Sequence, residues 1–188
     1  MTHASSLVAA LRSVALTVPD LALAEDFFTR TWHLQVVART ENALYFRGAG
    51  SDHHLLALHH APGAAQILNI TLRARSLNAL ALAAQKTAAA GGQVLVPSAP
   101  LVEPGGGHAV TLADPDGRVF RLVYDDEQLE AIDAPDMPLR LAHVVLNSSH
   151  VEDTRQFMES ALDFSMSDRT RIMAFMRCNN DHHSVALG

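Results

Sequence analysis

Residues 46–58 read FRGAGSDHHLLAL, and residues 176–187, at the end of the 188-residue chain, read MRCNNDHHSVAL. With one extra residue allowed in the first stretch, both show an apolar-Arg strand pattern, a short polar turn and an Asp-His-His triplet that leads into another apolar strand pattern. A repeat of this kind indicates that one supersecondary unit is used more than once. It also puts histidine at the entrance of a strand, where a metal ion can be held.

The segments around these two stretches repeat in the same order. Residues 7–60 predict a strand, a helix that begins after the N-cap residue Asp20, and three further strands. Residues 64–126 predict the same order, with Ser76 as the helix N-cap. We therefore expect two βαβββ units in this part of the chain, together forming an N-terminal domain over residues 1–126.

The remaining residues begin the unit a third time. Residues 127–138 are acidic and contain two prolines, which favours a linker. Residues 139–188 then predict a third βαβββ unit, which we expect to be half of a C-terminal metal-binding domain. The expected fold class is α+β, with three tandem units present.

Composition narrows the function classes. The formal net charge of −6 and the absence of a Lys/Arg run argue against nucleic acid as a partner. Cys178 is the only cysteine, so a reducing compartment is the default. No stretch approaches the length of a membrane span and the N-terminus lacks a signal-peptide pattern. We expect a soluble, cytoplasmic protein without a membrane partner.

Tandem βαβββ units with an Asp-Pro-Asp-Gly turn at 114–117 before a closing strand resemble the vicinal oxygen chelate superfamily. This superfamily includes glyoxalase I, bleomycin-binding proteins and extradiol ring-cleaving dioxygenases. The chain looks most like the type I extradiol dioxygenases, which carry four units as two domains and hold metal only in the second. The resemblance implies cupped mixed sheets with the helices on the outside.

The resemblance also implies a metal site. In that family two histidines and one carboxylate hold Fe(II) or sometimes Mn(II); His143 matches the first histidine and His183 the second. Such a site leaves positions open for a catechol-type substrate and for O₂ as co-substrate. Fe(II) is the expected metal, with Mn(II) or Zn(II) as alternatives. Because successive residues of a regular strand point to opposite faces, we expect His183, on the face of Val185, and not His182, to reach the metal.

Two members of the expected site are missing from the sequence. The resemblance implies that the carboxylate comes from a fourth unit, and the corresponding position of the second unit is Arg121. With Ser13 and His54 as its other matching residues, the N-terminal pair of units is expected to hold no metal. A segment that usually carries an acid–base histidine contains Asp168 instead, which is a weak catalytic candidate because a carboxylate suits proton transfer near neutral pH poorly.

Three functions remain open from the sequence. The first is an extradiol-dioxygenase-like metalloprotein that cleaves or binds a catechol-type aromatic. Its third unit then belongs to a longer protein, or pairs with the third unit of a second copy in a homo-oligomer such as a dimer; pairing in trans brings four histidines together without a glutamate, which suits Zn or Ni better than oxygen chemistry. The second is a non-catalytic, small-molecule-binding member of the same superfamily. A glyoxalase-type isomerase or lyase ranks last, because its closing-strand glutamates have no counterpart here.

Overall fold

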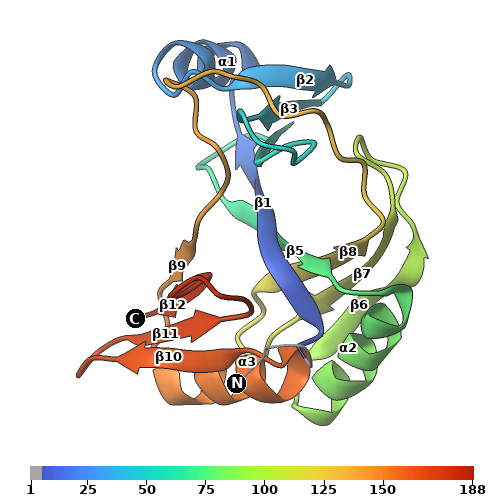
Figure 1. The fold of residues 1–188 in the computed structure, drawn as a ribbon, viewed down its shortest axis with the longest axis vertical. Helices are drawn as coiled ribbons and strands as arrows, with labels where there is room; N and C mark the ends of the chain where they lie inside the picture. Colours follow the sequence, from blue (N-terminus) through green and yellow to red (C-terminus); the bar gives the residue numbers. More distant parts are fainter. Residues whose placement is uncertain (1–5) are drawn as a thin grey trace.

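Three successive segments fold in the same βαβββ order in the computed structural model, which describes residues 6–188 (Figure 1). Residues 1–5, the start of the expected N-terminal domain, lie outside the described residues. The first unit contains β1 (Val8–Val18), α1 (Leu21–Arg30), β2 (Gln35–Arg39), β3 (Ala43–Arg47) and β4 (Leu56–His60). The second contains β5 (Ile67–Ala74), α2 (Leu77–Ala89), β6 (Gln93–Pro100), β7 (His108–Ala113) and β8 (Val119–Tyr124). The third contains β9 (Val144–Leu146), α3 (Val151–Leu162), β10 (Ser165–Arg169), β11 (Ala174–Arg177) and β12 (Val185–Leu187).

Strand pairing repeats from unit to unit. In each unit the first strand pairs in parallel with the last: β1 with β4, β5 with β8, and β9 with β12. The first two units join through the antiparallel pair β1–β5 into an eight-stranded sheet of order β2-β3-β4-β1-β5-β8-β7-β6, and the third unit forms its own four-stranded sheet of order β10-β11-β12-β9. The expected α+β fold of mixed sheets is confirmed, and the three copies of the repeat share one topology.

Local signals in the sequence form the predicted caps and turns. The side chain of Asp20 accepts a hydrogen bond from the backbone N–H of Leu23, and Ser76 caps α2 in the same way through Ala79. Between β7 and β8, Asp114 Oδ1 accepts from two backbone N–H groups of the turn, and Gly117 takes the positive φ of 82° that the turn requires. The glycine and aspartate of this turn therefore have separate physical roles.

The segment between the second and third units crosses the first unit closely. The backbone N–H groups of Ala49 and Gly50 donate to the carbonyls of Pro138 and Leu139. A Cβ on Gly48 would lie 2.0 Å from the carbonyl oxygen of Pro138. This close backbone approach explains why the first copy of the repeat has glycines where the second reads Cys-Asn-Asn.

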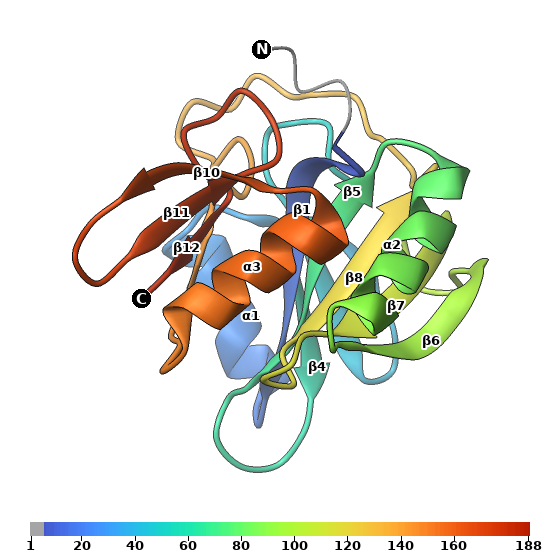
Figure 2. The same cartoon turned by 90° about the horizontal axis from the view of Figure 1, so that it is seen from below.

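The largest core cluster joins the second and third units and includes the start of β1, with Val8 and Leu11. Ala83 of α2, Phe120 of β8 and Phe157 of α3 belong to one continuous buried cluster, together with Leu187 of β12. Figure 2 shows α2 and α3 side by side, on the same side of the molecule. The first unit has a separate cluster around Phe46, between its sheet and α1. The third unit is therefore packed on the second through its helix.

Among residues 6–188, no helix combines the length and apolar character needed to cross a membrane.

Candidate metal centre

His143 and His183 come together at one end of the third unit's sheet. His143 immediately precedes β9 and His183 lies two residues before β12, and these two strands pair in parallel with Val144 opposite Val185. The centroids of the two imidazole rings are 4.7 Å apart. His143 is exposed and His183 is half-buried, with the ring of Phe175 5.1 Å from it. The pairing of the two strands thus places two nitrogen donors side by side.

The expectation that His183 lies within a regular strand is wrong. The sequence predicts a strand over 183–187, but β12 begins at Val185 and His183 lies in the loop before it. Val185 is fully buried, whereas His183 contacts Phe175, which is paired with Ala186 and so faces the other side of the sheet. The loop backbone leaves the pleat and turns the imidazole toward His143, which strand alternation cannot predict.

The adjacent histidines also contact each other. His182 Nδ1 lies 2.9 Å from His183 Nδ1, with the two rings nearly perpendicular at 88°. Burial lowers the pKa of His183, and the neighbouring His143 and His182 lower it further. A neutral His183 that donates from Nδ1 to His182 leaves its Nε2 lone pair free, which is the form that binds metal. His182 is therefore placed to set the tautomer of His183.

The first copy of the triplet has the same geometry in a closed setting. His53 Nδ1 lies 2.9 Å from His54 Nδ1, with the rings at 84°. Both histidines are buried, and Arg12 Nη1 donates to His54 Nε2 at 2.7 Å. Because arginine only donates, Nε2 of His54 must accept, and Nδ1 carries the proton that His53 receives. Burial, followed by the charge of Arg12, lowers the pKa of His54 to about 2.

Arg12 reaches this position through an irregularity in β1. The register of β1 against β5 shifts between Leu11 and Ser13, so Arg12 is an extra residue in the ladder and its side chain turns to the same side as Ser13. Asp126 neutralises the buried guanidinium at 3.1 Å and also binds Arg73 through both of its oxygens. The guanidinium of Arg12 thus occupies the Nε2 lone pair of His54, which a metal ion would otherwise need.

Ser13 and Arg121, the other residues of the first two units that match the expected metal site, also bind protein side chains. Arg121 lies on β8 and forms an ion pair with Glu103 at 2.7 Å, and Ser13 Oγ accepts a hydrogen bond from Arg12. Sequence reasoning missed Arg12 and Asp126, which are 114 positions apart. The available signal was the pair of consecutive polar residues, Arg12 and Ser13, inside an otherwise apolar strand pattern.

Asp168 and Asp181 flank the third-unit histidines. Asp168 is exposed on β10, and its Oδ2 is 3.9 Å from Nε2 of His182. Asp181 forms a two-pronged ion pair with Arg140 at 2.8 and 2.9 Å. Asp52 of the first triplet pairs with a different arginine, Arg73 on β5 of the second unit, at 2.9 Å. The aspartate of each triplet therefore anchors its turn.

Two imidazoles suit a divalent transition metal, but two donors do not complete a site. Within residues 6–188, no cluster of three or more His, Cys, Asp or Glu side chains has the arrangement needed to hold a metal ion. The donor set of this chain is thus one ligand short of the two-histidine, one-carboxylate pattern.

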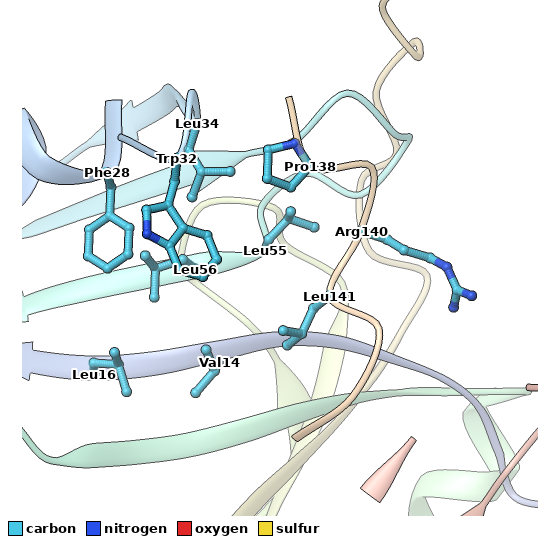
Figure 3. A pocket seen from close by; sticks show the side chains of 10 residues that line it. All are labelled: Val14, Leu16, Phe28, Trp32, Leu34, Leu55, Leu56, Pro138, Arg140 and Leu141. Atoms are coloured by element: carbon cyan, nitrogen blue, oxygen red, sulfur yellow. The ribbon is translucent and has the colours of Figure 1, made fainter. Parts of the chain in front are cut away.

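A separate apolar pocket of about 350 Å³ lies on the first unit (Figure 3). Phe28 and Trp32 line it from the end of α1, Val14 and Leu56 from the sheet, and Leu141 from the segment that leads to β9. Its lining includes neither His143 nor His183. The pocket therefore lacks the nitrogen donors and is distinct from the candidate metal centre.

Comparison with known protein families gives a match over most of the chain. The sequence profile of the Glyoxalase/Bleomycin resistance protein/Dioxygenase superfamily matches residues 10–122 and 140–187. The two matched ranges cover nearly all of the three βαβββ units and leave out the whole linker. No curated protein sequence matches the chain significantly.

Solved structures are also similar to this chain over nearly its whole length. The chain is similar to a Mn(II)-bound glyoxalase from Novosphingobium aromaticivorans, with 30% sequence identity, a TM-score of 0.92, and coverage of 97% of this chain and 62% of that one. Homoprotocatechuate 2,3-dioxygenase from Brevibacterium fuscum, in complex with 3,4-dihydroxyphenylacetate, has 22% identity, a TM-score of 0.85, and coverage of 97% and 60%. The enzyme of that name from Arthrobacter globiformis has 23% identity, a TM-score of 0.84, and coverage of 97% and 60%. The two dioxygenases share the fold, and this chain spans about three-fifths of the length of each of these proteins.

Proposed function

The chain belongs to the Glyoxalase/Bleomycin resistance protein/Dioxygenase superfamily, and from this premise we propose that it is an extradiol-dioxygenase-like metalloprotein. His143 and His183 are the proposed ligands of a divalent metal, with Fe(II) as the first candidate. The third ligand, a carboxylate, comes from outside these 188 residues. The proposed substrate is a small catechol-type aromatic with two adjacent oxygens.

One observation carries this proposal: the two Asp-His-His copies share their histidine geometry but differ in what faces the second histidine. In the first unit Arg12 and Ser13 face His54, and Arg12 fills its Nε2 lone pair. The third unit has Ala142 and His143 at the corresponding positions. An internal cation is thus replaced by a second nitrogen donor, which supports binding of an external cation at this place and not at His54.

The chain's own residues prepare such a site in three ways. His182 Nδ1 lies 2.9 Å from Nδ1 of His183, and in the tautomer in which His183 donates this hydrogen bond its Nε2 lone pair is available to a metal. Arg140 holds Asp181, and with it the turn that carries both histidines. Phe175 covers one side of His183 and keeps that side apolar. A bound metal would supply chelation of the two substrate oxygens and would hold O₂ beside the ring.

A second candidate function is small-molecule binding without chemistry. The position of Asp168 favours it, because this carboxylate is exposed and its Oδ2 lies 3.9 Å from Nε2 of His182, beyond hydrogen-bond distance. General acid–base catalysis needs a group within hydrogen-bond reach of the reacting atoms. If this second function is the true one, the metal-loaded protein binds catechol and consumes no oxygen.

Native mass spectrometry after anaerobic incubation with Fe(II) tests the metal proposal, because it reports metal per chain and oligomeric state together. We expect the wild-type chain to take up Fe(II), and His143→Ala and His183→Ala to abolish the uptake. His150→Ala is the matched control, since His150 is exposed and lies on the surface before α3. His54→Gln should keep full metal content, because Arg12 already occupies the nitrogen of His54.

Fe(II) uptake that survives both His143→Ala and His183→Ala would refute the assignment of these two ligands. A metal-free monomer would mean that the two histidines do not hold metal without the carboxylate from outside these residues, or that the chain is a binding module. For the loaded wild-type chain, an oxygen electrode with catechol as the probe then separates the two functions. Oxygen uptake supports ring cleavage, whereas catechol binding seen by absorbance without oxygen uptake supports the binding function.

A further inference from the structure

Arg121 of β8 points away from the helices. Its neighbours along the strand, Phe120 and Leu122, belong to the buried cluster that contains Ala83 of α2, and successive strand residues point to opposite faces of a sheet. Figure 2 shows α2 along one face of β7 and β8. The side chain of Arg121, which is 17% exposed, therefore lies on the other face of the eight-stranded sheet, which we call the helix-free face.

A row of polar side chains crosses the sheet on the helix-free face. Strand pairing puts Thr71 of β5 and Thr111 of β7 on either side of Arg121, and it puts Ser13 of β1 next to Thr71. Residues that pair directly across strands point to the same face. Thr71 and Ser13 are buried. Because buried polar residues at adjacent positions are unusual in a sheet, this row is a candidate binding surface.

Residues of the first unit lie close to Arg121 on the same face. Tyr45 of β3 is buried, and its ring centroid lies 5.0 Å from that of His54. Burial raises the pKa of Tyr45, and the negative charge of Glu103 raises it further, whereas the positive charge of Arg121 lowers it. Burial and Arg12 lower the pKa of His54, and the charge of Arg121 adds to this effect. The first two units therefore meet around the guanidinium of Arg121.

The guanidinium of Arg121 is only partly satisfied by its protein partner. Glu103, in the connection between β6 and β7, accepts a hydrogen bond through Oε2 from Nη1 of Arg121 at 2.7 Å. Within residues 6–188, Nε of Arg121 is buried and has no hydrogen-bond partner. A guanidinium can hold one carboxylate through two parallel N–H groups, and a buried donor without a partner costs free energy. The ion pair with Glu103 therefore leaves binding capacity of Arg121 unused.

The carboxylate of Glu103 borders solvent, whereas the backbone that carries it is held in place. The side chain of Glu103 is 35% exposed, and the adjacent Val102 is 98% exposed. The backbone carbonyl of Glu103 accepts from the N–H of Gly106, and the N–H of Leu101 donates to the carbonyl of Gly107 across the connection. The side chain of Glu103 can therefore rotate into solvent while its backbone stays in the closed turn.

We propose that Arg121 is the centre of a binding site for small organic carboxylates, in which the ligand displaces the side chain of Glu103 and binds both Nε and Nη1 of the guanidinium. Glu103 is then an internal competitor that occupies the site in the absence of ligand. A single carboxylate suits the place because its exchange for Glu103 leaves the net charge beside Arg121 unchanged. A phosphate dianion would instead leave one negative charge without a partner in a half-buried position.

Benzoate is the probe, with benzamide as its uncharged isostere, and calorimetric titration without added metal keeps the result independent of His143 and His183. If the carboxylate of Glu103 occupies Arg121 about nine-tenths of the time, Glu103→Gln should bind benzoate roughly tenfold more tightly than the wild type does. Benzamide should not bind to either protein, and benzoate should not bind to Arg121→Gln. Glu25→Gln is the matched control, because Glu25 pairs with Arg39 at the same 2.7 Å on the exposed surface.

The Nε–H signal of Arg121 in proton–nitrogen correlation NMR reports the new hydrogen bond directly. The signal is identified by its loss in Arg121→Gln. We expect it to move downfield when benzoate is added to the wild type or to Glu103→Gln, because Nε then gains an acceptor that it lacks in the free protein. Circular dichroism shows whether Glu103→Gln folds, and the wild-type signal tests the proposal even where that variant does not fold.

Several outcomes would overturn the carboxylate site. One is an Nε–H signal of Arg121 in the wild type that does not move at high benzoate concentration. Another is equal affinity for benzoate in the wild type and in folded Glu103→Gln. The same holds for benzoate binding that survives in Arg121→Gln, that is gained equally in Glu25→Gln, or that benzamide matches. In each case the pair of Glu103 and Arg121 is a structural ion pair and not a ligand site.

Discussion

The buried imidazole of His54 should make folding stability fall as the pH is lowered from 7 to 5. His54 accepts from Arg12 through Nε2 and donates to His53 through Nδ1, so a second proton has no acceptor and would face a guanidinium. The folded state therefore keeps His54 neutral, and its pKa is lowered to about 2 from the usual 6.5. The unfolded chain, in contrast, protonates this histidine as the pH passes 6.5.

The sign and size follow from proton linkage. Below pH 6.5 the unfolded state binds one more proton at His54 than the folded state does, so the free energy of unfolding decreases as the pH falls. The slope approaches about 1.4 kcal/mol per pH unit, and integration from pH 7 to pH 5 gives a loss of about 2 kcal/mol. The loss would end only near the folded-state pKa of about 2.

Urea unfolding at pH 7, 6 and 5, followed by Trp32 fluorescence and circular dichroism, measures this loss. In His54→Gln the amide oxygen replaces Nε2 as the acceptor for Arg12 and cannot be protonated in this range, so the pH-dependent loss should be smaller by about 2 kcal/mol. His150→Gln, which removes an exposed histidine, should keep the wild-type slope. Equal slopes in the wild type and His54→Gln would refute the reasoning, whatever the absolute stability of the variant.

Three further variants probe the packing by denaturant unfolding at pH 7. Asp126→Asn leaves the buried guanidinium of Arg12 without its counter-ion and should cost on the order of 3–5 kcal/mol, whereas a cost below about 1 kcal/mol would mean that the pair is not buried in solution. Gly48→Ala forces a Cβ onto the carbonyl of Pro138 and should cost about 1–3 kcal/mol; an unchanged midpoint would show that the linker does not pass there. Phe157→Ala should cost about 3–5 kcal/mol and expose α2 and α3 together to hydrogen exchange, and loss of protection in α3 alone would contradict the shared core.

Sequence reasoning predicted the features that depend on neighbouring residues. The N-caps Asp20 and Ser76 and the turn at 114–117 formed as expected, because caps and turns use hydrogen bonds and φ values within a few residues. The repeat itself predicted the common topology, since similar segments bury similar faces in the same way. The pairing of His143 with His183 remains a proposal as a metal site, although the two rings do lie together.

The sequence predicted less well where each strand begins and to which face of the sheet a side chain points. β1 begins at Val8, because antiparallel pairing with β5 extends the strand through Ala- and Leu-rich residues whose own preference is not for strands. The strand expected at 183–187 starts only at Val185, and β9 is limited to Val144–Leu146. Because His183 lies outside the regular strand, the alternation of side chains between sheet faces could not predict which way its imidazole points.

The amino-acid sequence by itself determined the number of units, their order of elements, and the positions of the two histidine pairs, because these depend on short-range pattern and on repetition. Only the tertiary structure decided how the pairs differ. A bulge in β1 turns Arg12 onto His54, and Asp126, 114 positions away, neutralises it. In the third unit the residue that corresponds to Arg12 is Ala142, which carries no charge. Contacts over such separations are set by strand register and packing between units, for which no local pattern in the chain carries a signal.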